Sequence, residues 1–105
     1  MKREYVTITV RFREGDEHLV AFVTERARQG DMRVSSALTI LVLAGIVPLL
    51  RHMPGPRAAL RRWLRHLCTR YGRRRISAVI GYPVRDLERE IQRAPHAANH
   101  QGAPA

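Results

Sequence analysis

Two shortages bound the possibilities for this chain: it has almost no cysteine, and its middle has no acidic residue. Cys68 is the single cysteine, so an internal disulfide and a zinc site built from several thiolates are both excluded. Residues 32–85 contain eleven arginines and not one aspartate or glutamate. The segments on either side are nearly balanced, so this middle generates the whole net charge of +10. A field of this kind attracts a polyanion.

Lysine is also scarce, because Lys2 is the only one among 19 basic residues. Arginine binds anions through a planar, bidentate fork, whereas lysine acts as a point charge. A solvated helix would normally intersperse glutamates that pair with arginines four residues away, and those glutamates are missing here. We therefore expect a nucleic-acid partner, and we keep an anionic membrane surface and plain solubility as alternatives.

The chain is short, with 105 residues. It corresponds to one small domain with or without an appendage, and such a chain buries too little surface for a deep substrate cleft. The five histidines show no paired metal-ligand spacing, and the glycines form no phosphate-binding loop. We expect a homodimer that is not an enzyme and uses neither a cofactor nor a metal.

Long hydrophobic runs are missing too. The apolar run from Ala37 to Leu50 is shorter than the roughly 20 residues that a spanning helix needs. The polar, alternating start of the chain lacks the apolar region of a signal peptide. We therefore expect a cytoplasmic protein that does not reside in a membrane, with residues 34–47 forming a helix buried on nearly every side.

The hydrophobic pattern predicts a strand followed by helices. Residues 4–12 alternate strictly, which is typical of a β-strand. A helix is expected over 16–29, ending at Gly30, and a second over 34–47, ended or kinked by Pro48. After a proline-glycine linker at 53–56, an amphipathic helix carries an apolar stripe and many arginines. An arginine triplet, a short apolar segment over 76–80 and a last helix from Pro83 to about Arg93 follow. From these we predict a domain of residues 1–53, a basic helical extension over 54–93 and a disordered tail over 94–105.

A lone strand leaves its backbone donors and acceptors unpaired. We therefore expect two copies of the chain to pair their strands antiparallel. The predicted dimer core consists of the inward face of the strand and residues of the second helix: Val6, Ile8, Val10, Phe12, Leu38, Leu41 and Val42.

This order of elements resembles the ribbon-helix-helix (Arc/MetJ/CopG-like) DNA-binding superfamily. The resemblance is carried by the strand Thr7-Ile8-Thr9-Val10-Arg11-Phe12, a short turn, a helix ending at Gly30 and an apolar helix opened by Arg33-Val34-Ser35-Ser36. It covers residues 4 to about 48. It implies a mainly α fold with one N-terminal β-strand, in which an intertwined dimer forms a two-stranded ribbon and the helical extension follows.

The resemblance also implies a DNA-binding site. The ribbon enters the major groove, with Thr7, Thr9 and Arg11 facing base edges, and arginine can bind guanine bidentately there. The N-terminus of the second helix presents its amides to a phosphate. Arg33 stands where a serine or threonine cap is usual. The predicted phosphate contacts are Lys2, Arg3, Arg33, Val34, Ser35, Ser36, Arg73, Arg74 and Arg75.

The C-terminal half is similar in layout to ParR-type plasmid centromere-binding adaptors. That similarity implies sequence-specific binding to double-stranded DNA, cooperative on repeated sites, in plasmid partition and/or autorepression, with higher-order dimer arrays and a partition motor filament as further partners. Transcriptional repressors, antitoxins and relaxosome accessory proteins share the N-terminal unit and remain alternatives, as does a basic membrane-surface or protein-interaction module. We expect residues 57–93 to pack dimer against dimer, because one protomer's short helices offer little area.

Overall fold

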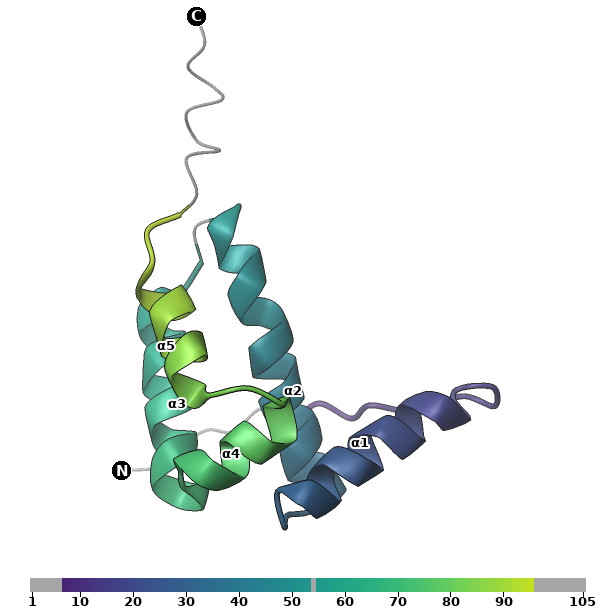
Figure 1. Ribbon diagram of the computed structural model, residues 1–105. Coiled ribbons are helices and arrows are strands. Elements are labelled where there is room, and N and C mark those ends of the chain that lie inside the picture. Colours follow the sequence, from purple (N-terminus) through teal and green to yellow (C-terminus); the bar gives the residue numbers. More distant parts are fainter. Residues whose placement is uncertain (1–6, 54, 96–105) are drawn as a thin grey trace, which may run out of the picture.

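The computed structural model describes residues 7–53 and 55–95, and the regular structure within these ranges is entirely helical (Figure 1). The sequence predicts four of the helices to within a few residues, and a fifth α-helix and a short 3-10 helix, η1, add to them. The elements are α1 (Glu17–Gln29), α2 (Val34–Ile46), η1 (Val47–Arg51), α3 (Arg57–Tyr71), α4 (Arg73–Ile80) and α5 (Val84–Gln92).

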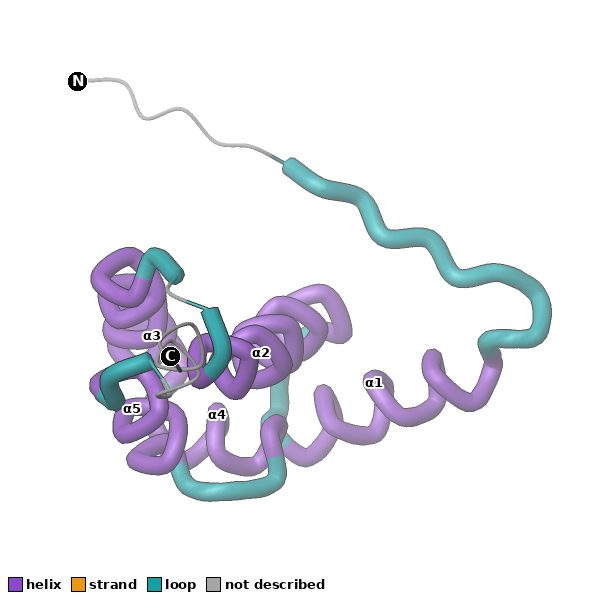
Figure 2. Tube along the Cα trace, turned by 90° about the horizontal axis from the view of Figure 1, so that it is seen from above, coloured by secondary structure: helices purple, strands orange, loops and turns teal. Residues whose placement is uncertain are grey.

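The expected N-terminal β-strand is wrong, and so is the β-ribbon fold class built on it. Residues 7–12 follow an irregular, elongated path before α1 (Figure 2), and the described part of the chain contains no strand. Residues 4–6 of the expected strand lie outside the described residues. Alternation shows which side chains share a face, but a strand also needs a neighbouring backbone for its hydrogen bonds. The described chain supplies no such neighbour.

The helices form an L (Figure 1). Helices α2, α3 and α5 make up its upright part, α4 lies across one end of them, and α1 extends sideways from that end (Figure 1). Helix α1 contacts α2 and α4, while α5 contacts α3 and η1. The α1–α2 corner is therefore held by α4, an element from the far half of the sequence.

Gly30 ends α1 as the sequence predicts, but its role is close packing. Its φ is −89°, and the left-handed conformation falls instead on Asp31, at φ 54°. A Cβ on Gly30 would collide with the Val79 side chain of α4. Glycine is needed here because the backbone of α1 approaches α4 closely.

Helix α4 contains both the arginine triplet and the short apolar segment that the sequence shows after Gly72. Three arginines in a first turn oppose the helix dipole. Two of them are compensated: Arg73 forms an ion pair with Glu88, and Arg75 donates to backbone carbonyls. The helix follows from these tertiary contacts as well as from its buried apolar side chains, Ile76, Val79 and Ile80.

One hydrophobic core runs through most of the chain, from Val23 to Ile91, and crosses the domain boundary predicted at residue 54. The α3 stripe Leu60, Leu64 and Leu67 is buried within it. The stripe therefore needs no second dimer to cover it, and our reason for expecting dimer-to-dimer packing of residues 57–93 is wrong. The protomer supplies enough area because α4 and α5 pack on α3.

The apolar helix α2 is buried on one side only. Ala37, Ile40 and Leu43 are inaccessible to solvent, whereas Val42 and Ile46 on the other side are exposed. This corrects the expectation that the helix is buried nearly all round. The segment Val34–Arg51 is long and apolar enough to cross a membrane by length and composition, with 28% of it buried within the protein.

Candidate nucleic-acid interface

The N-terminus of α2 presents unsatisfied backbone amides to solvent. The first amide that donates within the helix is that of Ala37, which bonds to the Arg33 carbonyl at 3.0 Å. No side chain caps this end, and its first turn carries no acid. The amides of Val34, Ser35 and Ser36 therefore keep the positive end of the helix dipole open to an anion.

Arg75 braces the turn that leads into this helix. Its Nε donates to the Gly30 carbonyl at 2.9 Å, and its Nη2 donates to the Asp31 carbonyl. The guanidinium also lies 5.4 Å from the centre of the Tyr71 ring. These contacts hold the α1–α2 turn against α3 and α4.

Tyr71 adds a second brace one turn further along. Its hydroxyl donates to Ser36 Oγ at 3.0 Å. The hydrogen bond with Ser36, assisted by the neighbouring Arg70 and Arg75, lowers the pKa of Tyr71. The hydroxyl of Ser36, predicted to meet a phosphate, is thus engaged within the protein, while its backbone amide faces no acceptor.

The predicted phosphate contacts converge only in part. Arg33 and Arg74 are exposed, and Arg74 lines a shallow hollow beside the α1–α2 corner together with Asp31 and Tyr71. Arg73 and Arg75 also belong to the triplet, but their guanidinium groups already bind Glu88 and the turn. Lys2 and Arg3 lie outside the described residues. The structure thus brings two segments 40 residues apart in sequence to one corner.

The predicted base contacts and dimer core lie mostly on the surface. Thr7, Thr9 and Arg11 are exposed on the segment before α1. Of the predicted dimer core, Ile8 is 81% and Val10 53% exposed. Phe12 and Val42 are also exposed, Leu38 and Leu41 are partly buried, and Val6 lies outside the described residues.

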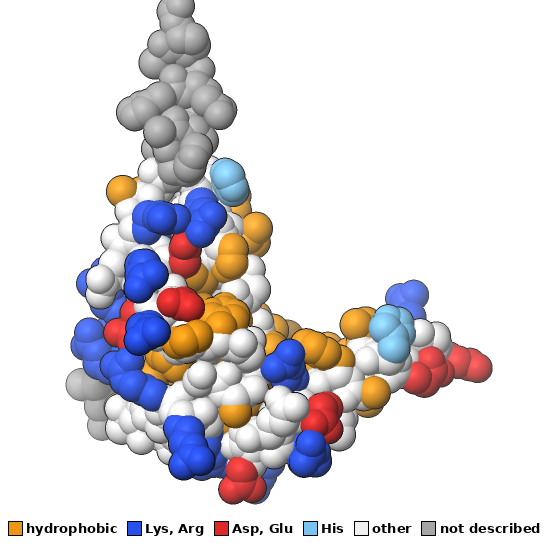
Figure 3. All heavy atoms as spheres, viewed as in Figure 1, with side chains coloured by type: hydrophobic (Ala, Val, Ile, Leu, Met, Phe, Trp, Pro, Cys, Tyr) orange, Lys and Arg blue, Asp and Glu red, His pale blue; other side chains and the backbone are white. Residues whose placement is uncertain are grey.

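Exposed hydrophobic side chains lie along the inner sides of both arms of the L, on α2 and on α1 (Figure 3). Four of these side chains form one stripe that runs from α2 through η1 to residue 53: Val42, Ile46, Leu49 and Met53. Three more lie on α1: Leu19, Val20 and Phe22. Single exposed apolar residues are ordinary, but an exposed apolar patch such as the α2–η1 stripe marks an interaction surface.

Basic side chains gather on the other side, over α3 and α5 (Figure 3). The carboxylates of α5 pair with some of them: Glu90 with Arg51 and Arg93, Glu88 with Arg73, and Asp86 with Arg89. Six exposed arginines of the described chain beyond residue 32 have no ion pair, hydrogen bond or ring contact: Arg33, Arg61, Arg62, Arg65, Arg74 and Arg85.

Sequence reasoning missed which arginines hold the protein together. Arg57 is half-buried and donates to three backbone carbonyls, those of Leu50, Glu90 and Ile91. Through these hydrogen bonds, Arg57 joins the start of α3 to the C-terminal ends of η1 and α5. Nothing in the sequence distinguishes it from Arg61 or Arg62, because its role depends on where α5 ends.

In the part of the chain that the structure describes, no three histidine, cysteine or acidic side chains are placed to hold a metal ion. No protein-family model, curated protein or solved structure matches this chain.

Proposed function

We propose that this chain binds double-stranded DNA as a homodimer. The observation that carries the proposal is the convergence at the α1–α2 corner. Open amides of α2 follow Arg33, which is the N-cap residue of this helix, and Arg74 from the other half of the chain lines the adjoining hollow with Asp31. A helix N-terminus with an unpaired guanidinium group at its start suits a phosphate diester.

The segment before α1 is our candidate for reading the sequence of the DNA. Thr7, Thr9 and Arg11 are exposed there, and no described protein group bonds to their side chains. Arginine can bind guanine O6 and N7 together, and threonine offers a hydroxyl and a methyl group. The phosphate contacts at the corner would fix the position of this segment on the duplex.

The exposed apolar patch supports the homodimer. Val42, Ile46 and Leu49 are 45%, 37% and 53% exposed although they belong to the most apolar part of the chain. A second copy would bring the same patch, so one two-fold contact covers both. It would also double the number of phosphate contacts and match a palindromic site.

The strand of the resemblance is absent from the described residues, so the proposed biological role rests on the helix–Gly30–helix order and the basic charge alone. Cooperative binding to repeated sites would suit a cytoplasmic plasmid partition adaptor or an autorepressor. A repressor, antitoxin or relaxosome accessory protein would use the same DNA contacts. We infer no catalytic activity.

Site-selected DNA and two variants test the proposal. The full chain is titrated onto a fragment selected from random duplexes, at two salt concentrations. Arg11→Ala should weaken binding to the selected site by about 1–3 kcal/mol and reduce the preference for that site over other sequences. Arg74→Ala should weaken binding to all sequences alike, and it should lower the slope of log K against log salt concentration by about one.

Arg62→Ala removes another exposed arginine, which lies on α3 and lines no hollow with Arg74, and is the matched control. Equal losses for Arg74→Ala and Arg62→Ala would assign the binding to diffuse charge. Unchanged site preference in Arg11→Ala would remove the proposed reading role of the N-terminal segment.

A membrane-surface role is the second candidate, because the outer face of Val34–Arg51 is apolar and α3 is basic. Co-sedimentation with vesicles of anionic and of neutral lipid tests it. Tight binding to anionic vesicles by a chain that ignores duplex DNA would favour this candidate over the DNA-binding proposal.

A further inference from the structure

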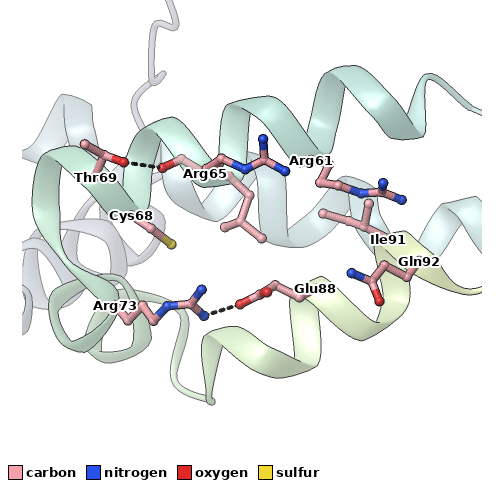
Figure 4. A pocket seen from close by; sticks show the side chains of 9 residues that line it. Arg61, Arg65, Cys68, Thr69, Arg73, Glu88, Ile91 and Gln92 are labelled. Carbon is pink, nitrogen blue, oxygen red and sulfur yellow. Dashed lines mark hydrogen bonds and ion pairs between the residues drawn. The ribbon is translucent and has the colours of Figure 1, made fainter.

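A groove of about 330 Å³ separates α3 from α5 and ends at the start of α4 (Figure 4). It lies apart from the α1–α2 corner, and no residue lines both sites. Its rim is basic and its floor is apolar.

The basic rim is formed by two arginines of α3. Arg61 and Arg65 are one helical turn apart, both are exposed, and no described group pairs with either. Like charges four residues apart on a helix repel one another. An anion placed between the two guanidinium groups would relieve this repulsion.

The α5 wall of the groove does not neutralise Arg61 and Arg65. Glu88 is the one acid among the lining residues, and its Oε1 already pairs with Arg73 at the end of the groove (Figure 4). Across from Arg61, α5 presents Gln92 and Ile91, neither of which is charged (Figure 4).

The floor is apolar. Leu64 and Ile91 lie beneath it and are only 3% and 1% exposed, so its accessible part is the half-buried Cys68, whose Sγ points toward the gap between the helices (Figure 4). Burial raises the pKa of the Cys68 thiol. The thiol is therefore neutral at neutral pH, and the floor carries no charge.

We propose that this groove binds an acidic segment of a partner protein, with carboxylates on Arg61 and Arg65 and an apolar side chain against Cys68 in the gap between α3 and α5. Guanidinium groups bind carboxylates bidentately. A DNA backbone would meet the same arginines, but it has no apolar side chain for the floor. The inference does not depend on the proposed DNA binding.

Fluorescence anisotropy with a labelled peptide of alternating Glu, Asp and Leu residues tests it on the full chain. We expect saturable binding that weakens about tenfold or more in Arg61→Gln/Arg65→Gln. Gln92→Glu should also weaken it, because the new carboxylate competes for Arg61. Arg62→Gln/Arg85→Gln removes two exposed arginines outside the groove and should leave binding within about twofold.

Two peptide controls separate the rim from the floor: Gln in place of the acids, and Ala in place of Leu. Both should bind weakly. Equal loss in Arg62→Gln/Arg85→Gln, or full binding by the Ala peptide, would overturn the groove as a peptide site. Displacement of the peptide by duplex DNA, with the same dependence on Arg61 and Arg65, would also overturn it.

Discussion

Helices α1 and α5 both have apolar faces, but only α5 covers the whole of its face. Val84, Leu87 and Ile91 of α5 are at most 4% exposed, because α3 and η1 lie against them. In α1, Val23 and Ala27 are buried, whereas Leu19 and Phe22 are nearly half exposed. An amphipathic pattern therefore shows which side chains share a face of a helix, and not whether the other helices of the chain cover that face.

Helix α2 contains the same contrast within a single element. Its inner face packs on α1, α3 and α4, and its outer face is apolar and exposed. We interpret the inner face of α2 as part of the protomer's core and the outer face as the contact between two protomers. The following predictions test this division, from the largest effect to the smallest.

The largest effect is expected at Ile40, which is fully buried on the inner face of α2. Ile40→Asp places an unpaired carboxyl in the core and should cost about 4–5 kcal/mol or more, enough to unfold a domain of this size. Circular dichroism during thermal unfolding measures it. A cooperative transition close to that of the unmodified chain would contradict the assigned core.

The next effect concerns Arg57. Arg57→Ala leaves three backbone carbonyls without their shared donor, and we expect a loss of about 2–3 kcal/mol. Arg62→Ala, on the exposed face of the same helix, should change stability by about 0.5 kcal/mol or less. Urea unfolding of both variants measures the difference, and equal values would show that Arg57 does not join η1 to α5.

Val42→Asp tests the outer face, two residues from Ile40. Because Val42 is 45% exposed, the protomer should keep its helices. The dissociation constant of the dimer should rise about tenfold to a hundredfold, since a charge in an apolar contact costs about 1–3 kcal/mol. Sedimentation velocity over a range of concentrations measures this, and an unchanged dimer would place the two-fold contact elsewhere.

The smallest effect is electrostatic. Hydrogen bonding from Arg51 lowers the pKa of Glu90, so the ionised carboxylate stabilises the folded state. This contribution is complete above the ordinary carboxyl pKa and is lost as the pH falls below it. Glu90→Gln should therefore flatten the stability profile between about pH 7 and about pH 3. Glu14→Gln, at an exposed and unpaired carboxylate, is the control and should leave the profile unchanged.

The sequence by itself determined the positions of α1, α2, α3 and α5, because apolar spacing, Gly30, Gly72 and the prolines act over a few residues. It also determined the concentration of positive charge in the middle of the chain. It did not predict α4 as a helix, since the first turn of α4 is stabilised by Glu88 and by the α1–α2 turn.

Only the tertiary structure decided the state of the N-terminal segment and the roles of the arginines. A strand requires a hydrogen-bonding neighbour, and alternation at residues 4–12 cannot supply one. An arginine in the sequence carries the same charge whether it braces a turn, as Arg75 does, or stays open to an anion, as Arg74 does. Which of these it does depends on the groups that packing brings within hydrogen-bond distance, and those groups lie far away in the sequence.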